Sequence, residues 1–433
     1  MVRSASIGGL ALSCVMVVAC GAKTGLDAPD IAFAQDAALD GLVDVTSDAP
    51  ERCIEAPLED ADVAPVVLDL AIQARVGAAD VLFVMDRTGS MSEEIDNIRQ
   101  SLRTVIVPGL VRAIPDLQLG LVSFGDFPVT PFGSQEDRPF TLERPMGREF
   151  TALQGALTSL RAGGGGDNPE ALTEALYQVA TGEGLRAGRP GQEFWIEPAA
   201  GCRVPGVGYP CFRTRATPIV VVVTDAPTHN GPRPESNYTA GSFIPSAALP
   251  HTYAQAVDAM RRTLHGRMIG INSGVGLSTA RPDLESFAND LGSLGSDGQP
   301  LVFDINPDGT GLSEQVVSSV TRLINEVRLS VSARAVDLDG SGAAAFVRAI
   351  VPRTAAPMSN VQRVTASAFE GVVPGTTLRF DLVLDRGRIP RRAETVRYVI
   401  RIEYLEDERV VLSAQDIAIV VPGTGAPRCP NDQ

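Results

Sequence analysis

The chain has 433 residues, a length that allows two or three domains. Hydrophobic residues make up 44% of it, which is enough to fill real cores. The formal net charge of −15 and the sequence pI of about 4.8 argue against nucleic acid as a partner. They argue equally against a basic surface that binds membranes.

Residues 1–19 have the pattern of a bacterial lipoprotein signal peptide. Arg3 supplies a positive start, an apolar run follows, and Val17-Val-Ala-Cys20 resembles a lipobox. The pattern predicts a lipid on Cys20 and hence a membrane anchor; the alternative is an ordinary signal peptide that contains a cysteine. The apolar run is too short to cross a membrane as a helix. Because Gly21 stands where an inner-membrane retention signal has aspartate, the predicted location is the outer membrane of the cell envelope, facing the periplasm or the surface.

Residues 20–64 are rich in alanine, aspartate and proline, and we predict that they form an acidic, disordered tether. Residues 65–78 differ, because Val66 to Ala74 alternate well enough for a β-strand. This strand need not belong to the sheet that starts near Val81. It could instead be the first strand of a β-sandwich formed by the other end of the chain.

Strands and helices alternate over residues 79–327, which is typical of a doubly wound, Rossmann-like α/β fold with a mostly parallel sheet. The most β-branched run, Pro218 to Thr224, predicts a central strand. Pro108 is expected to interrupt the first helix. The predicted strands are 81–85, 117–124, 218–224, 268–272 and 301–303, and the predicted helices are 93–114, 150–160, one that ends at 180, 252–264, 282–291 and 312–327.

From residue 328 to 424 the pattern changes to short alternating runs separated by glycine and proline turns. This pattern predicts an all-β sandwich domain. Its expected strands are 329–336, 361–368, 377–384, 396–404 and 414–421. Residues 425–433 are left as a C-terminal tail that carries Cys429.

Two of the six cysteines lie in the signal region, and Cys53, Cys202, Cys211 and Cys429 remain. An even number of cysteines in an oxidising compartment suggests two disulfides, for which three pairings can be drawn. Cys202–Cys211 closes a short loop and is the natural local pair. That choice leaves Cys53 to pair with Cys429.

The predicted strand at Val81 to Met85 ends in the turn Asp86-Arg-Thr-Gly-Ser90, and a helical pattern follows. The turn offers a carboxylate and two hydroxyls on alternate residues, which suits Mg²⁺ or Mn²⁺, although short turns of this composition also cap helices. A strand end followed by a helix is a common ligand site in α/β sheets. The turn resembles the signature of von Willebrand factor type A (vWA) domains. In that family it forms a metal-ion-dependent adhesion site, which implies Asp86, Thr88 and Ser90 as metal ligands.

Two later segments strengthen the resemblance and are similar to the A-like domains of integrin β subunits. Residues 163–170 carry four glycines and then Asp-Asn-Pro-Glu, and the resemblance implies that Glu170 is a metal ligand. Val223-Thr-Asp225 ends the central strand, and the resemblance implies that Asp225 ligates the metal or orients a metal-bound water. The residues alone leave open that both segments merely cap helices. No Gly-Lys-Ser/Thr follows the glycines, so a phosphate-binding P-loop is excluded.

The same resemblance implies metal sites beside the central one. Glu93 and Glu94 stand where the integrin β domains have acids of an adjacent site, although glutamate is longer than aspartate. Asp126 matches an acid of a further flanking site, and Asp167 would join it, while Gly165 stands where the family has an asparagine ligand. The expected cofactors are Mg²⁺ or Mn²⁺ at the centre and Ca²⁺ at a flanking site.

The function that this resemblance implies is a cell-envelope module for adhesion and protein binding. Its open metal position would capture a carboxylate of a protein partner, with residues 230–250 as a candidate rim loop or a tolerated insertion. No nucleic acid or small-molecule substrate is expected. The alternatives are a structural subunit with a stabilising metal and a metal-dependent hydrolase. Since His229, His251 and His265 form neither a metal-ligand nor a triad spacing, the chain is predicted not to be an enzyme.

Overall fold

The computed structural model of the protein describes residues 50–56, 64–189, 192–203, 205–238, 249–276 and 279–429. The predicted signal peptide, Cys20 and most of the predicted tether lie outside these ranges, as does the middle of the candidate rim loop. Within them, no helix is both long and apolar enough to cross a membrane.

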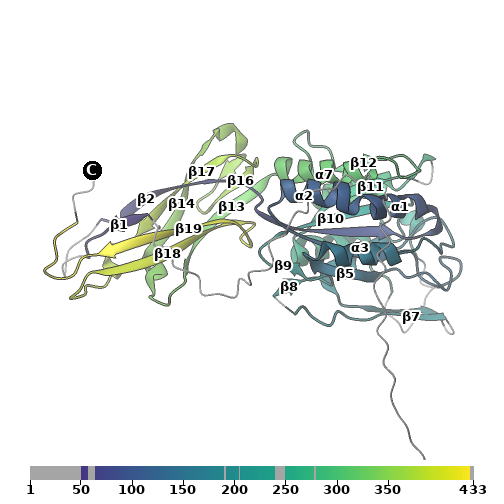
Figure 1. The fold of residues 1–433 in the computed structure, drawn as a ribbon, viewed down its shortest axis with the longest axis horizontal. Helices are drawn as coiled ribbons and strands as arrows, with labels where there is room; N and C mark the ends of the chain where they lie inside the picture. The colour runs from purple at the N-terminus through teal and green to yellow at the C-terminus, as the bar shows by residue number, and fades with distance from the viewer. Residues whose placement is uncertain are drawn as a thin grey trace, which may run out of the picture. The chain divides into compact units, whose positions relative to one another are not determined.

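A six-stranded sheet forms the centre of the α/β part of the chain (Figure 1). Its strands in spatial order are β12 (Val302–Asp304), β11 (Arg267–Asn272), β10 (Thr217–Thr224), β3 (Ala78–Asp86), β4 (Asp116–Phe124) and β5 (Thr141–Gly147). All neighbours are parallel except β4 and β5, which pair antiparallel. Every residue of β10 is buried, as expected of a central strand covered on both faces.

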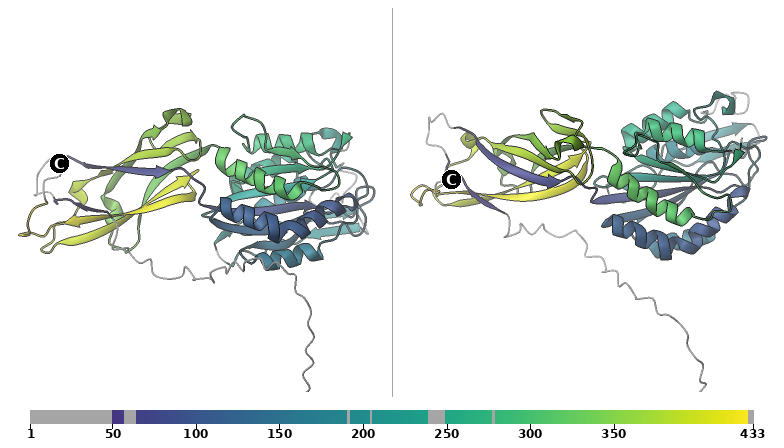
Figure 2. Two further views of the ribbon diagram at one scale, coloured as in Figure 1. Left: turned by 45° about the horizontal axis from the view of Figure 1, so that its top comes forward. Right: turned by 90° about the horizontal axis from the view of Figure 1, so that it is seen from above.

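Helices cover both faces of this sheet (Figure 2). Val81, Phe83 and Met85 of β3 pack on one face and Leu82 and Val84 on the other, because side chains of a strand alternate. The first face carries α1 (Ser92–Ser101), α2 (Val107–Ala113), α3 (Phe150–Ser159) and α7 (Leu312–Glu326), and the second carries α4 (Leu172–Thr181), α5 (Tyr253–Asp258) and α6 (Arg281–Asp290). The predicted doubly wound α/β fold is confirmed.

The first helical segment does not break where the sequence predicted. Helix α1 continues through a π-helical turn, Leu102–Ile106, directly into α2, and Pro108 lies in the first turn of α2. A proline removes one helical hydrogen bond and crowds the carbonyl four residues earlier. That carbonyl belongs to Thr104, inside the wider π-helical turn, which accommodates the proline without ending the helix.

Several short strands of the α/β part were not predicted. Strand β5 lies at the sheet edge and none of its residues is fully buried, so its sequence shows no alternation. Two hairpins lie outside the main sheet: β6 (Leu185–Arg189) with β7 (Gln192–Ile196), and β8 (Gly206–Val207) with β9 (Phe212–Arg213). Arg213 binds the buried Asp80 of β3 and Asp116 of β4, which ties the second hairpin to the sheet.

The remaining strands form two further sheets that enclose one apolar core. The larger sheet has the order β1 (Glu51–Cys53), β19 (Val410–Val421), β18 (Val396–Glu406), β13 (Leu329–Asp337), β16 (Ala368–Val372) and β15 (Arg363–Val364). The smaller one has the order β14 (Val347–Ala356), β17 (Thr377–Leu384) and β2 (Val66–Gln73). Since β2 pairs with β17 along its whole length, strands from before and after the α/β part share this sandwich.

The sandwich differs from the sequence predictions at three strands. Strand β1 lies within the stretch predicted to be a disordered tether, because its partner β19 is far away in the sequence. Strand β14 was missed because it lies at an edge, contains Pro352 and buries little, so it lacks the alternation of an inner strand. The strand expected at 361–368 is replaced by the short β15, a turn, and β16, which extends to Val372. Here Thr365 caps the turn by accepting a hydrogen bond from the N–H of Ala368.

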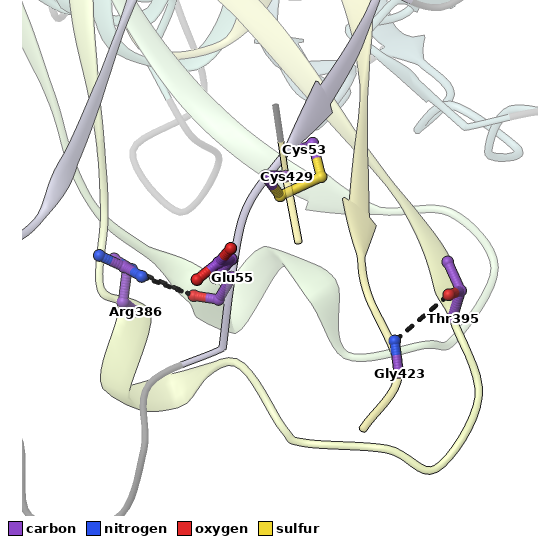
Figure 3. The surroundings of a disulfide bond; sticks show 6 residues. All are labelled: Cys53, Glu55, Arg386, Thr395, Gly423 and Cys429. Atoms are coloured by element: carbon purple, nitrogen blue, oxygen red, sulfur yellow. Dashed lines mark hydrogen bonds between the residues drawn. A yellow bond between two sulfur atoms is a disulfide. The ribbon is translucent and has the colours of Figure 1, made fainter. Parts of the chain in front are cut away.

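Two disulfides are present, and they join the expected pairs. Cys202–Cys211 closes a loop between β7 and β9. Cys53 at the end of β1 is bonded to Cys429, beyond the end of β19, with Arg386 holding the carbonyl of nearby Glu55 (Figure 3). Because such bonds persist in oxidising compartments, the protein is extracytoplasmic.

Candidate metal centre

The central motif lies where β3 and its neighbours end. From β3 the chain builds the sheet towards β4 and β5, and it then returns to the other side of β3 as β10. Open α/β sheets bind ligands at such a reversal, beyond the carboxyl ends of the strands. Asp86 is the last residue of β3, and Asp225 directly follows Thr224, the last residue of β10.

Asp86 is held in one orientation by hydroxyl and amide groups. Its Oδ1 accepts hydrogen bonds from the N–H and the hydroxyl of Thr88, at 2.9 and 2.7 Å. Its Oδ2 accepts one from the hydroxyl of Thr224, at 2.6 Å. The Thr88 hydroxyl lies 3.5 Å from that of Ser90, which is exposed. Asp86, Thr88 and Ser90 therefore line one site, and Thr224 is a positioning residue that sequence reasoning missed.

The glycine-rich loop is fixed against this turn. The N–H of Gly163 donates to the carbonyl of Arg87 at 2.8 Å. Gly164 and Gly165 have φ values of +90° and +91°, which favour glycine. Asp137 accepts the N–H of Gly165, and a Cβ at Gly164 would lie 2.1 Å from Oδ1 of Asp137. Asp137 was not singled out from the sequence, because its loop shows no motif.

Glu170 reaches the same site from the start of α4. A parallel bridge between Glu170 and Thr228 ties it to the segment after β10. Its side chain is buried, and no described residue donates a hydrogen bond to Oε2. A Cβ at Gly165 would lie 3.7 Å from Oε1 of Glu170 and 3.9 Å from Cβ of Thr88. Glu170 and Thr88 therefore flank the same glycine.

Buried carboxylates of like charge are concentrated at this centre. Burial, followed by the charge of Asp225, raises the pKa of Asp86 to about 7. Burial, followed by the charges of Asp86 and other acids, raises the pKa of Glu170 to about 11. Oδ1 of Asp225 is also buried, with no hydrogen-bond partner among the described residues. Orphaned carboxylate oxygens beside two hydroxyls are the donor set that Mg²⁺ and Mn²⁺ take, so these residues fit a divalent cation.

The two acids expected at an adjacent site have different surroundings. Glu93 is exposed and accepts a hydrogen bond from the hydroxyl of Ser92. Glu94 is buried, and its Oε2 has no hydrogen-bond partner within the described ranges. Burial raises the pKa of Glu94, and the charge of Asp225 adds to the effect. Glu94, rather than Glu93, therefore lies beside the central carboxylates.

The acids expected at the further flanking site, Asp126 and Asp167, converge on His229. Burial lowers the pKa of His229, but its hydrogen bonds to the two carboxylates outweigh burial and raise the pKa to about 9. Tyr238, which donates its hydroxyl to Asp126, completes the cluster. The sequence offered one signal for His229, its place four residues after Asp225, and none for Tyr238.

The comparisons identify the class of domain that carries this site. Residues 80–184 match the family model of the von Willebrand factor A domain. The match covers less than half of the chain. The matched residues lie in the doubly wound α/β part of the chain, which carries Asp86, Thr88, Ser90 and Glu170. No curated protein sequence matches the chain.

Solved structures similar to the chain are distant in sequence. A von Willebrand factor type A protein from Catenulispora acidiphila is 12% identical over 86% of this chain and 71% of its own, with a TM-score of 0.36. The pilus adhesin SpaC from Lactobacillus rhamnosus GG is 10% identical over 86% and 47%, with a TM-score of 0.34. Proximal thread matrix protein 1 from the mussel byssus is 14% identical over 61% and 51%, with a TM-score of 0.32. At these values the structures carry no argument about function, and this chain spans only about half of the latter two.

The raised pKa values predict how pH acts on this centre. A raised carboxyl pKa contributes stability that is fully present below the unfolded value and is lost as pH rises through the folded value. For Asp86 the window runs from an ordinary 3.8 to about 7. The metal-free protein should therefore lose stability across this window, while Mg²⁺, which needs deprotonated carboxylates, should raise the Tm more at pH 8 than at pH 5.5.

Thermal unfolding with EDTA and with Mg²⁺, measured at both pH values, checks this prediction. Asp86→Asn is the matched variant, because it removes the titrating group and keeps the side-chain size. Its metal-free Tm should depend less on pH than that of the wild type. An equal gain in Tm from Mg²⁺ at both pH values would contradict the prediction.

Proposed function

We propose that the protein is an adhesion or protein-binding module of the cell envelope that captures a carboxylate of a protein partner through a divalent metal. One observation carries this proposal. Two buried acids, Asp86 and Glu170, and the half-buried Asp225 come from distant segments and meet two hydroxyls at the open end of the sheet. One oxygen of Glu170 and one of Asp225 are buried and have no hydrogen-bond partner among the described residues. Such a constellation is suited to a divalent cation, and the exposed Ser90 supports an accessible side.

The chain's own residues have separate roles at this site. Thr88 and Thr224 orient Asp86 through its two oxygens, so the carboxylate cannot rotate away. Glu170 is aimed inward by the bridge to Thr228. A bound Mg²⁺ would supply a Lewis-acidic position for an oxygen of the partner. Water is excluded from the inner side by the buried β3 and β10, so the partner is expected to reach the site from the side of Ser90.

Affinity capture from envelope extract, in Mg²⁺ and in EDTA, tests this function. We expect specific partners to be retained in Mg²⁺ and released by EDTA. A glutamate-to-glutamine change in a captured partner should abolish its binding if the metal takes a carboxylate. Retention of the same partners in EDTA, with the protein still folded, would instead favour a structural subunit whose metal serves stability.

We also propose that the protein is held at the membrane by a lipid on Cys20, which lies outside the described residues. The lipobox-like sequence Val17-Val-Ala-Cys20 supports this, and the outer membrane is the proposed location. Mass spectrometry of the mature N-terminus should find diacylglyceryl-cysteine at position 20, and Cys20→Ser should release the protein into the soluble fraction. A mature N-terminus beyond residue 20 would refute the anchor.

A further inference from the structure

We propose that Asp126, Asp167 and His229 form a second metal site that selects a transition-metal dication such as Zn²⁺. One ligand atom of each residue can be chosen so that all three lie within 4.8 Å of one another. Nε2 of His229 lies 3.2 Å from Oδ2 of Asp126 and 3.3 Å from Oδ1 of Asp167. The resemblance to integrin β domains implied Ca²⁺ ligands at the two acids, but it implied no imidazole.

The other ring nitrogen of His229 shows where the imidazole lone pair points. Nδ1 lies 2.6 Å from the carbonyl oxygen of Ser236. A carbonyl can only accept a hydrogen bond, so Nδ1 carries the hydrogen and Nε2 of the neutral ring is left with its lone pair. That lone pair faces two carboxylate oxygens. Two carboxylates that converge on Nε2 favour a positive charge at that point, which either a proton on Nε2 or a metal cation that displaces this proton can supply. A carbonyl-bound Nδ1–H is the usual support of a metal-bound histidine.

Hydrogen bonds also hold the side chain of Asp126 in one orientation. Its side chain is fully buried, and its Oδ1 accepts hydrogen bonds from the N–H of Phe127, at 2.6 Å, and from the hydroxyl of Tyr238. Its Oδ2 faces Nε2 of His229 at 3.2 Å and has no other polar partner among the described residues. One oxygen is therefore fixed by donors while the other is left for the point where the three ligands meet.

Aromatic rings hold the imidazole in place, and one side of the cluster stays accessible. Phe132 meets the ring of His229 edge-on, with centroids 5.2 Å apart, and Tyr238 stacks on it at 4.2 Å. His229 is only 4% exposed, whereas the side chain of Asp167 is 33% exposed. A cation can therefore reach the cluster past Asp167 and meet ligands that need little rearrangement.

The kind of ligand decides the class of metal. Ca²⁺ takes six to eight oxygen ligands and Mg²⁺ demands oxygens in an octahedron, whereas imidazole nitrogen favours Zn²⁺, Cu²⁺, Ni²⁺ and iron. Two carboxylates and one histidine, with a position left for water or a partner, suit Zn²⁺ best. The site therefore differs in metal preference from the oxygen-only centre at Asp86, and its occupancy does not depend on the proposed function of that centre.

Calorimetric titration of Zn²⁺ into the EDTA-stripped full chain, with Mg²⁺ kept saturating, tests the proposal. We expect one Zn²⁺ equivalent in the wild type. His229→Gln and Asp167→Asn should each lower the Zn²⁺ affinity by at least about 100-fold, because each removes a ligand. Because the side chain of Asp167 is partly exposed, the fold of Asp167→Asn should persist, so a loss of Zn²⁺ binding in this variant reports on the site. Co²⁺ in place of Zn²⁺ should give a visible absorption band that both variants lose.

Two further variants separate this site from its alternatives. His251→Gln is the matched control, because His251 also faces a buried carboxylate, Glu174 at 2.9 Å, but only one; its Zn²⁺ binding should equal that of the wild type. Asp86→Asn should likewise keep Zn²⁺ binding while it loses Mg²⁺ binding. Equal Zn²⁺ affinity in wild type and His229→Gln, or no Zn²⁺ uptake by the wild type, would overturn the proposal and leave a protonated His229 as the cation of the cluster.

Discussion

Replacing Asp86 by asparagine is expected to lower the Mg²⁺ affinity of the protein by a factor of roughly 30 to several thousand. Removing one member of a buried, charge-assisted contact costs about 2–5 kcal/mol, which corresponds to that range. Asparagine keeps the size of the side chain and one oxygen, which can accept from Thr88, while its NH2 can donate to the hydroxyl of Thr224. The loss should therefore come from the missing charge and not from a collapse of the turn.

Titration of Mg²⁺ by calorimetry measures this effect, and partner capture should fall in parallel. Asp96→Asn is the matched control, because Asp96 is an exposed acid of α1 that pairs with Arg99 on the surface. Its Mg²⁺ affinity should stay at the wild-type value. The fold of Asp86→Asn should persist, since Val81 to Met85 of β3 remain buried. Equal Mg²⁺ affinity in Asp86→Asn and wild type would refute the central site.

Removing the disulfide between Cys53 and Cys429 is expected to lower the free energy of unfolding on the order of 5 kcal/mol in the loop-entropy model. The bond joins residues 376 apart, so it restricts the unfolded chain far more than Cys202–Cys211, whose separation is 9 and for which about 3 kcal/mol is expected. Strand β1 pairs with β19 at only three positions, from Glu51 to Cys53. Without the bond, little else in the ladder holds β1.

Urea unfolding of the variant with serine at positions 53 and 429, beside one with serine at 202 and 211, measures the difference. Hydrogen exchange should show β1 losing protection in the first variant and keeping it in the second. If both variants shift the urea midpoint equally, the prediction that Cys53–Cys429 contributes more stability than Cys202–Cys211 is contradicted.

The arrangement of the α/β core was predictable because local sequence and burial agree there. The unbroken apolar runs at Val81 to Met85 and Pro218 to Thr224 can only be satisfied by strands covered on both faces. The strands at sheet edges were not predicted, because burial does not shape their local sequence in this way. Strands β5 and β14 each pair on one side and bury little, so no period-two pattern was required of them.

Some residues of the candidate site could be predicted from the sequence and others could not. Asp86, Thr88, Ser90, Glu170 and Asp225 could be named from the sequence because their segments resemble the metal-binding loops of vWA and integrin β domains. Thr224, Asp137 and Tyr238 could not, because their roles depend on contacts across the fold: Thr224 with Asp86, Asp137 with the glycine loop, and Tyr238 with Asp126.

By itself, the sequence determined the class of the fold and the turn that begins the candidate metal centre, because both follow from periodicity and from residues adjacent in the chain. Only the tertiary structure decided which carboxylates share a point in space and which of them lack a partner. His229 shows the difference most clearly. Its neighbours Asp126 and Asp167 are distant in the sequence, and the orientation of its ring depends on the carbonyl of Ser236, whose position only the folded loop determines.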